Sequence, residues 1–103
     1  MNYLVTRHKG ALNWLRSYIA GPIVHLEHAD DFSFLHPGDR VIGTLPVNLA
    51  ATVCGRGARY FHLSIRVPYD LRGKELTARQ LRELGATLEE YRVSKREDSP
   101  DSY

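Results

Sequence analysis

The sequence has little of what several common functional classes need. Its one cysteine, Cys54, rules out an internal disulfide and makes a cysteine-based metal site improbable. Fourteen basic and twelve acidic residues leave a formal net charge of +2, too small to predict a duplex-binding surface from charge alone. No apolar stretch reaches the roughly 20 residues of a membrane span, and the N-terminal stretch lacks a signal peptide's apolar core. We therefore expect a cytoplasmic protein with neither a membrane nor a DNA partner.

Glycine-rich phosphate loops and metal-ligand motifs are also missing. Gly10 and Gly43 stand alone, so the chain has neither a Walker loop nor a dinucleotide fingerprint. Five histidines invite a metal hypothesis, but His25 and His28 do not have the helical spacing of a zinc protease pair. We expect no metal and no cofactor.

The most informative stretch runs from residue 41 to residue 57, VIGTLPVNLAATVCGRG. A short apolar run is followed by the turn Gly43–Pro46 and then by apolar residues at helical spacing, which predicts a strand, a tight turn and a helix. Pro46 suits a helix start, and the free N–H groups there attract anions. Because the helix is apolar over most of its circumference, we expect it to be buried on more than one side, with Cys54 in the core.

Other segments alternate between strand and helix patterns. Strands are predicted at Tyr3–Thr6, Ile23–Leu26 and Arg59–Ile65, and residues 86–93 favour a strand over a helix. The apolar face of a first helix contains Ala11, Trp14, Leu15, Tyr18 and Ile19, and Gly21-Pro22 ends it. A last helix begins at a capping box formed by Thr77 and Gln80 and ends at Gly85.

The connections between these segments are also informative. Residues 27–39 are enough for a crossover between parallel strands, and we expect Phe32, Phe34 and Leu35 to pack on the core. Residues 66–73 read as a loop that could cover a pocket at the end of the preceding strand. Within that strand, we expect His62 to be a packed, hydrogen-bonded core histidine.

This alternation predicts one α/β domain over residues 1–93, a small Rossmann-like, doubly wound fold with a mostly parallel sheet. Residues 94–103, SKREDSPDSY, are polar and charged, so we expect a disordered tail. If the first strand lies beside the third, ligands should bind beyond the carboxyl ends of these strands.

The residues that follow the predicted strands have the composition of a phosphate site, with cations, hydroxyls and an imidazole. They are Thr6, Arg7 and His8 after the first strand, Thr44, Leu45, Pro46 and Asn48 after the third, and Ser64 and Arg66 after the fourth.

Structural roles are the simpler alternative for several of these residues. Arg7 and His8 fit exposed turn residues equally well, and Thr44 and Asn48 fit a turn and a first helical turn. Ser64 is not in a nucleophile elbow, so we expect a structural role for it.

Three stretches of the chain resemble the family numbered sixteen in the Csx series of small type III CRISPR-associated proteins. They are YLVTRHKGALNWL at residues 3–15, GDRVIGTLPVNLAATVCGRGARYFHLSI at residues 38–65, and LRGKELTARQLRELGATLEEYRV at residues 71–93. The TRH and GTLP turns are their most specific parts. The resemblance implies a CARF-like Rossmann fold, a homodimer, and ring nuclease activity. Such proteins bind cyclic oligoadenylate, chiefly cyclic tetra-adenylate, and cut it to linear products, which switches off the antiviral response.

The residues suggest how such a reaction could proceed without a metal. The ring carries its own nucleophile, the ribose 2′-OH, which must be aligned with the scissile phosphate while the developing charge is stabilised. We assign Arg7 to the phosphate and His8 to proton transfer. The residues expected to bind substrate are Thr6, Thr44, Leu45, Pro46, Asn48, Ser64 and Arg66. A non-catalytic sensor or sponge for the ring, and a protein-interaction module of the CRISPR system, are the alternatives.

Overall fold

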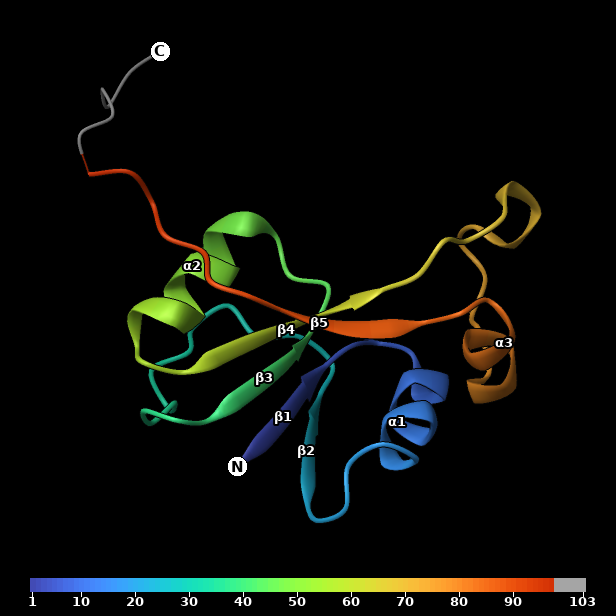
Figure 1. Cartoon of the computed structure of the whole chain (residues 1–103), viewed down its shortest axis with the longest axis horizontal. Helices are drawn as coiled ribbons and strands as arrows, with labels where there is room; N and C mark the ends of the chain where they lie inside the picture. The colour runs from blue at the N-terminus through green and yellow to red at the C-terminus, as the bar shows by residue number, and fades with distance from the viewer. Residues whose placement is uncertain (98–103) are drawn as a thin grey trace.

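Five short strands form a single sheet in the computed structural model, which describes residues 1–97 (Figure 1). The strands are β1 (Asn2–Val5), β2 (Ile23–Leu26), β3 (Arg40–Gly43), β4 (Arg59–Ser64) and β5 (Thr87–Tyr91). Their order is β2-β1-β3-β4-β5; the first four are parallel, and β5 is antiparallel to β4. The predicted α/β fold with a mostly parallel sheet is confirmed, and residues 86–93 do contain a strand.

Helices cover both faces of the sheet, because successive strand residues point to opposite sides. Helices α1 (Lys9–Arg16) and α3 (Ala78–Glu83) cover one face, where Trp14, Leu15 and Leu81 pack with Leu4 and Ile42. Helix α2 (Val47–Gly55) covers the other face. The apolar residues gathered there come from three strands, from α2 and from the connection before β3: Val5, Val41, Tyr60, Ala50, Val53, Phe32 and Leu35. The arrangement is doubly wound, as predicted.

The point where the chain reverses its direction across the sheet lies between β1 and β3. From β1 the chain goes to the edge strand β2 and then crosses back to β3 on the other side of β1. Val5 and Gly43 are partners at the carboxyl ends of these two strands. A Cβ atom at Gly43 would lie 2.7 Å from the Val5 carbonyl oxygen, so only glycine lets the strands approach this closely here. A doubly wound sheet binds its ligands beyond such a point.

The first helix is shorter than predicted. It ends at Arg16, well before Gly21-Pro22, and Tyr18 lies beyond it with 62% of its surface exposed. The cause is local, because the N–H of Ser17 donates to Trp14 and that of Tyr18 to Leu15, which tightens and closes the last turn.

The expectation that the second helix would be buried on more than one side was wrong. Only Ala50 and Val53 of α2 are buried, and Val47 is 73% exposed. The sheet packs against one face of α2, and no second layer covers the opposite face within residues 1–97. Cys54 is half-buried, and its Sγ accepts the Val93 N–H at 3.4 Å.

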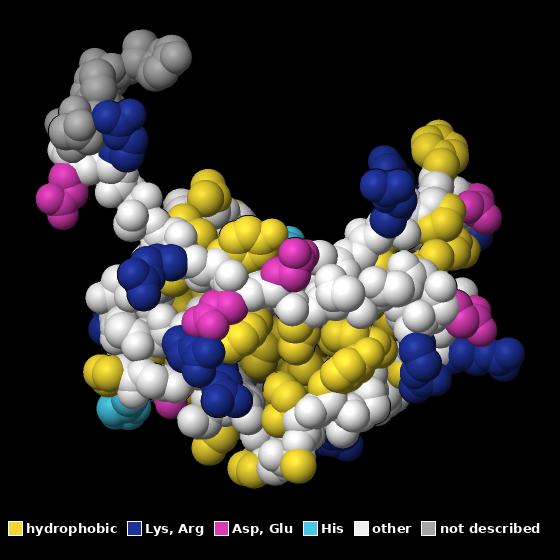
Figure 2. Space-filling model, in the orientation of Figure 1, with side chains coloured by type: hydrophobic (Ala, Val, Ile, Leu, Met, Phe, Trp, Pro, Cys, Tyr) yellow, Lys and Arg dark blue, Asp and Glu magenta, His cyan; other side chains and the backbone are white. Residues whose placement is uncertain are grey.

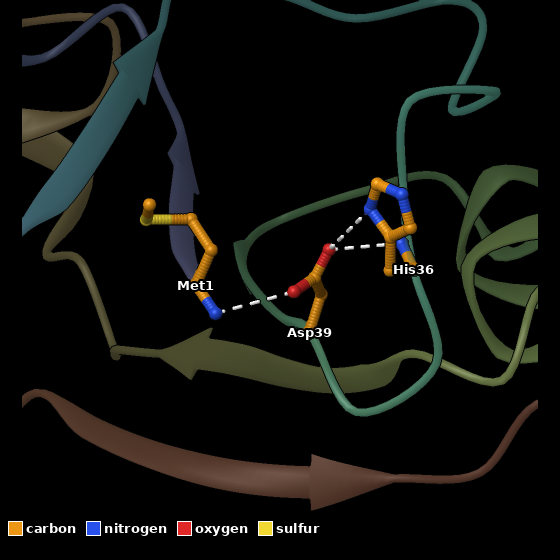
Figure 3. Close-up of polar contacts among 3 residues, drawn as sticks. All are labelled: Met1, His36 and Asp39. Carbon is orange, nitrogen blue, oxygen red and sulfur yellow. Dashed lines mark hydrogen bonds and ion pairs between the residues drawn. The ribbon is translucent and has the colours of Figure 1, made fainter.

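At the end of the sheet where the strands begin, the carboxylate of Asp39 links the amino ends of β1 and β3 (Figure 3). The Met1 amino group lies 3.2 Å from Asp39 Oδ1, and the His36 N–H donates to Oδ2 at 2.9 Å. These contacts, the His36 N–H above all, hold the pKa of Asp39 below its usual value despite burial. Asp39 thereby joins the start of β1 to the turn that leads into β3.

The end of the described chain carries little regular structure. Residues 94–97 form no helix or strand, and the rest of the tail predicted at 94–103 lies outside the described residues. Within residues 1–97, no helix is both long enough and apolar enough to cross a membrane.

Candidate functional site

A cleft of about 660 Å³ lies beyond the carboxyl ends of the central strands, on the face that α1 and α3 cover. Three predicted site residues line it, Thr6 and His8 after β1 and Thr44 after β3. The connection between β4 and α3 supplies two more polar side chains, Arg72 and Lys74. The structure therefore brings together polar residues that three separate segments contribute.

The turn from β1 into α1 is held by a set of hydrogen bonds around Thr6. The Thr6 N–H donates to the Leu26 carbonyl at 2.9 Å, and the His25 Nε2–H donates to the Thr6 carbonyl at 2.8 Å. Thr6 Oγ1 accepts the His8 N–H at 3.1 Å. These contacts set the backbone that carries Arg7 and His8. From the sequence, His25 was considered only as a metal ligand. Its hydrogen bond to Thr6 could not be predicted from a local pattern, because His25 lies in the neighbouring strand β2, far from Thr6 in the sequence.

The turn from β3 into α2 is held by the hydroxyl of Tyr60. This oxygen accepts the Leu45 N–H at 2.9 Å, and it lies 3.2 Å from the Gly43 carbonyl and 2.7 Å from His62 Nδ1. Burial raises the pKa of Tyr60, and the Leu45 N–H offsets part of that rise. The hydroxyl therefore stays protonated at neutral pH. The prediction that His62 is packed and hydrogen-bonded is confirmed, but the residue is half-buried and does not lie in the core.

Two helices begin at this edge of the sheet without an acidic residue in their first turns. His8 is the N-cap of α1 and Pro46 is the N-cap of α2, and neither side chain caps its helix. The first N–H groups of each helix have no acceptor within it. Because β1 and β3 are parallel neighbours, both positive helix ends lie at the carboxyl end of the sheet, although α1 and α2 cover opposite faces. Each helix start favours a bound anion.

The β4–α3 connection, residues 65–77, contributes lining residues to the cleft. Figure 1 shows this connection projecting beyond the end of β4 before it returns to α3. It contains the short 3₁₀ helix η1 (Tyr69–Leu71), and its Leu76 backbone lies directly against α1. A Cβ atom on Gly10 would lie only 1.9 Å from the Leu76 carbonyl oxygen. The capping box of Thr77 and Gln80, as predicted, then starts α3. The predicted loop does line a pocket. In the space-filling view, basic, acidic and hydrophobic side chains lie together on its projecting part (Figure 2).

The cleft suits an anionic ligand. None of the residues that line it, all within the described part of the chain, is acidic. Arg7 and Arg66 are exposed in the segments next to it, and neither forms an ion pair within residues 1–97. Among the same residues, no group of three or more His, Cys, Asp or Glu side chains could hold a metal ion.

Four other predicted residues lie away from the cleft. Leu45 packs with the apolar cluster on the α2 face, and Pro46 is the exposed N-cap of α2. Asn48 lines a second groove, between α2 and residues 92–97, with a volume of about 940 Å³. Ser64 lies in register with Tyr60 and His62, on the face opposite the cleft.

Comparisons with known proteins add one finding. Residues 3–94 match the model of the family described as "Putative CRISPR-associated protein (Cas_VVA1548)". Neither the curated proteins nor the solved structures gave a match. The matched range includes β2 to β5, all of β1 except Asn2, the residues that line the cleft and both turns that carry the predicted site residues. Since the match covers most of the chain, the chain belongs to this family of CRISPR-associated proteins.

Proposed function

We propose that this protein is a ring nuclease of type III CRISPR defence, which cleaves cyclic oligoadenylate, above all cyclic tetra-adenylate, to linear products. The observation that carries the proposal is one cleft in which Thr6, His8 and Thr44 meet Arg72 and Lys74. Membership of a CRISPR-associated family supports the biological setting. The sequence resemblance of the TRH and GTLP turns supports the substrate.

The charge distribution favours a ligand with several phosphates. Arg7, Arg72 and Lys74 place positive charge around the cleft, and two helix starts add their partial charges at the same edge. A ring of four adenylates carries four negative charges. Binding such a polyanion relieves the repulsion between these cations and makes charge-assisted hydrogen bonds.

The proposed chemistry needs a base for the ribose 2′-OH and an acid for the leaving oxygen. The 2′-oxygen attacks the adjacent phosphorus, the bond from phosphorus to the 5′-oxygen breaks, and a 2′,3′-cyclic phosphate and a 5′-OH result. His8 is the imidazole that lines the cleft, so it is our candidate for proton transfer. Arg7, beside it in the same turn, stabilises the charge that develops on the phosphate.

Incubation of the purified protein with cyclic tetra-adenylate in EDTA, followed by liquid chromatography and mass spectrometry, tests the proposal. We expect linear adenylates that end in a cyclic or a 3′ phosphate. The variant His8→Ala should cleave about 10²- to 10⁴-fold more slowly, the usual contribution of a general acid or base, while it still binds the ring.

His28→Ala is the matched control, because His28 is an exposed histidine in the connection between β2 and β3, away from the cleft. It should cleave at the wild-type rate. An unchanged rate in His8→Ala would remove His8 from the mechanism, and a ring left intact by the wild-type protein would overturn the proposed activity.

One observation favours a second candidate, a sensor that binds the ring without cutting it. The His8 imidazole has no hydrogen-bond partner among residues 1–97 that would orient it, whereas general acids and bases are usually held in place. Tight binding of cyclic tetra-adenylate without product would establish this alternative.

A further inference from the structure

We propose that the inner part of the cleft is a pocket for one nucleobase, and that Lys74 binds the phosphate of the same nucleotide. The identification of that base as an adenine of the ring rests on the proposed function. The pocket itself follows from the shape, the lining and the charge of the cleft.

The walls of the cleft are aliphatic. Ile65, Val67 and Leu71 of the β4–α3 connection form one side, and each is half-buried. Leu63 and Leu81, which are 8% and 4% exposed, form the floor against the core. Aliphatic side chains gain by covering a flat, uncharged ring, but they offer nothing to a sugar or a phosphate. The volume of about 660 Å³ lies within the range of small-ligand sites, about 300–1,000 Å³.

The polar side chains lie at the rim of the cleft, where they can form hydrogen bonds with the edge of a base. The Thr44 hydroxyl makes no hydrogen bond with another residue of the range 1–97, so it is free for a ligand. A hydroxyl both donates and accepts, and an adenine edge presents an amino donor beside a ring-nitrogen acceptor. Thr44 is therefore our candidate for contact with the base.

Lys74 is the cation best placed for a phosphate of the bound nucleotide. Its N–H donates to the Leu71 carbonyl at 3.2 Å, and Gly73 before it has a φ of +78°, so a tight turn sets its position. Its ammonium group has no ion-pair partner among residues 1–97, whereas Arg72 donates its Nε–H to the Val67 carbonyl at 3.4 Å. Lys74 thus presents a free charge at the rim of the pocket.

Titrations with adenosine 5′-monophosphate, adenosine and ribose 5-phosphate test the pocket directly, by NMR of the methyl groups. We expect the monophosphate to shift the methyl signals of Ile65, Val67 and Leu71 and to bind at least about tenfold more tightly than ribose 5-phosphate. Lys74→Ala should weaken the monophosphate about tenfold and leave adenosine unchanged. Equal binding of the monophosphate and ribose 5-phosphate would overturn the inference.

A variant with a larger side chain that fills the pocket provides a second test of the nucleobase pocket. Val67→Trp should lose the preference for the monophosphate and weaken cyclic tetra-adenylate about tenfold or more. Ala51→Trp, which fills the groove beside α2, and Lys95→Ala, which removes a lysine from that groove, are the matched controls and should bind like the wild type. Thermal unfolding of each variant checks that it is folded.

The outcomes separate this inference from the proposed function. If the monophosphate binds in the cleft while the ring is neither bound nor cut, the nucleobase pocket stands and the ring nuclease proposal fails. If the ring is cut by Val67→Trp and Lys74→Ala as fast as by the wild type, the pocket is wrong and the proposed activity stands.

Discussion

The hydroxyl of Tyr60 shows how much one atom can determine at the site. It holds both ends of the turn from β3 into α2, through the Leu45 N–H and the Gly43 carbonyl, and it also contacts His62. No other side chain donates to or accepts from this turn within residues 1–97. Thr44, which lines the cleft, lies between the two bonded residues, so its position depends on an atom that comes from the neighbouring strand.

Replacement of Tyr60 by phenylalanine tests this dependence. Tyr60→Phe keeps the buried ring but leaves the Leu45 N–H without its partner, so we expect a loss of about 1–3 kcal/mol in the free energy of unfolding. Cleavage of cyclic tetra-adenylate should fall as well. Urea denaturation and rate measurements check both. Tyr91→Phe is the control because Tyr91 is 47% exposed and at the sheet edge; a Tyr60→Phe variant as stable and active as this control would contradict the role.

At the scale of elements, the cleft depends on how closely α1 approaches the β4–α3 connection. Gly10 lies in the first turn of α1, and a Cβ atom there would lie 1.9 Å from a backbone carbonyl of Leu76. A backbone atom cannot rotate away as a flexible side chain can. The absence of a side chain at this one position therefore sets the distance between two walls of the cleft.

The variant Gly10→Ala should push these elements apart. We expect it to lower the free energy of unfolding by about 3 kcal/mol, at the upper end of overpacking effects, and to weaken ligand binding. Gly55→Ala is the control, since a Cβ atom there has nothing within 4 Å, and it should change stability by less than about 1 kcal/mol. Thermal and urea unfolding measure the stabilities of the two variants. If they were equally stable, α1 could move away from Leu76 without a loss of stability, and the prediction would be wrong.

The contacts of Asp39 with Met1 and His36 predict that the stability of the protein depends on pH. The pKa of the Asp39 carboxyl group is lower in the folded protein than in the unfolded chain. The stabilisation that these contacts supply is therefore fully present above the unfolded pKa of about 4, and it is lost as the pH falls through the folded pKa. Asp39→Asn keeps an acceptor for the His36 N–H but loses the ion pair with the Met1 amino group. We expect Asp39→Asn to be less stable at pH 7 and to lose less stability in acid. Urea unfolding between pH 2 and pH 7 measures this, and parallel profiles of the two proteins would refute it.

At the scale of the whole molecule, the site occupies one side of a small protein. The cations that line the cleft, Arg72 and Lys74, lie on the β4–α3 connection, and His8 lies in the turn between β1 and α1. A ring of four equivalent adenylates presents its phosphates in symmetric pairs. A two-fold axis through the ring would let two copies of the chain each meet half of it with identical contacts.

We therefore expect a homodimer that binds one ring. Isothermal titration calorimetry with cyclic tetra-adenylate and the His8→Ala variant, which we expect to cleave the ring only slowly, should give one ring for every two chains. Light scattering should give twice the chain mass of 11.7 kDa in the presence of the ring. One ring bound per chain, with the mass of a single chain, would exclude the symmetric arrangement.

The sequence by itself determined the strands, the turns and the start of α3, because these depend on local periodicity and on residues such as Thr77 and Gln80. It also located the two turns that carry Thr6, His8 and Thr44. Only the tertiary structure decided which side chains meet. The course of the β4–α3 connection brings Lys74 to the cleft, and the alternation of β4 turns Ser64 to the other face. Such contacts join residues far apart in the chain, and local pattern carries no information about them.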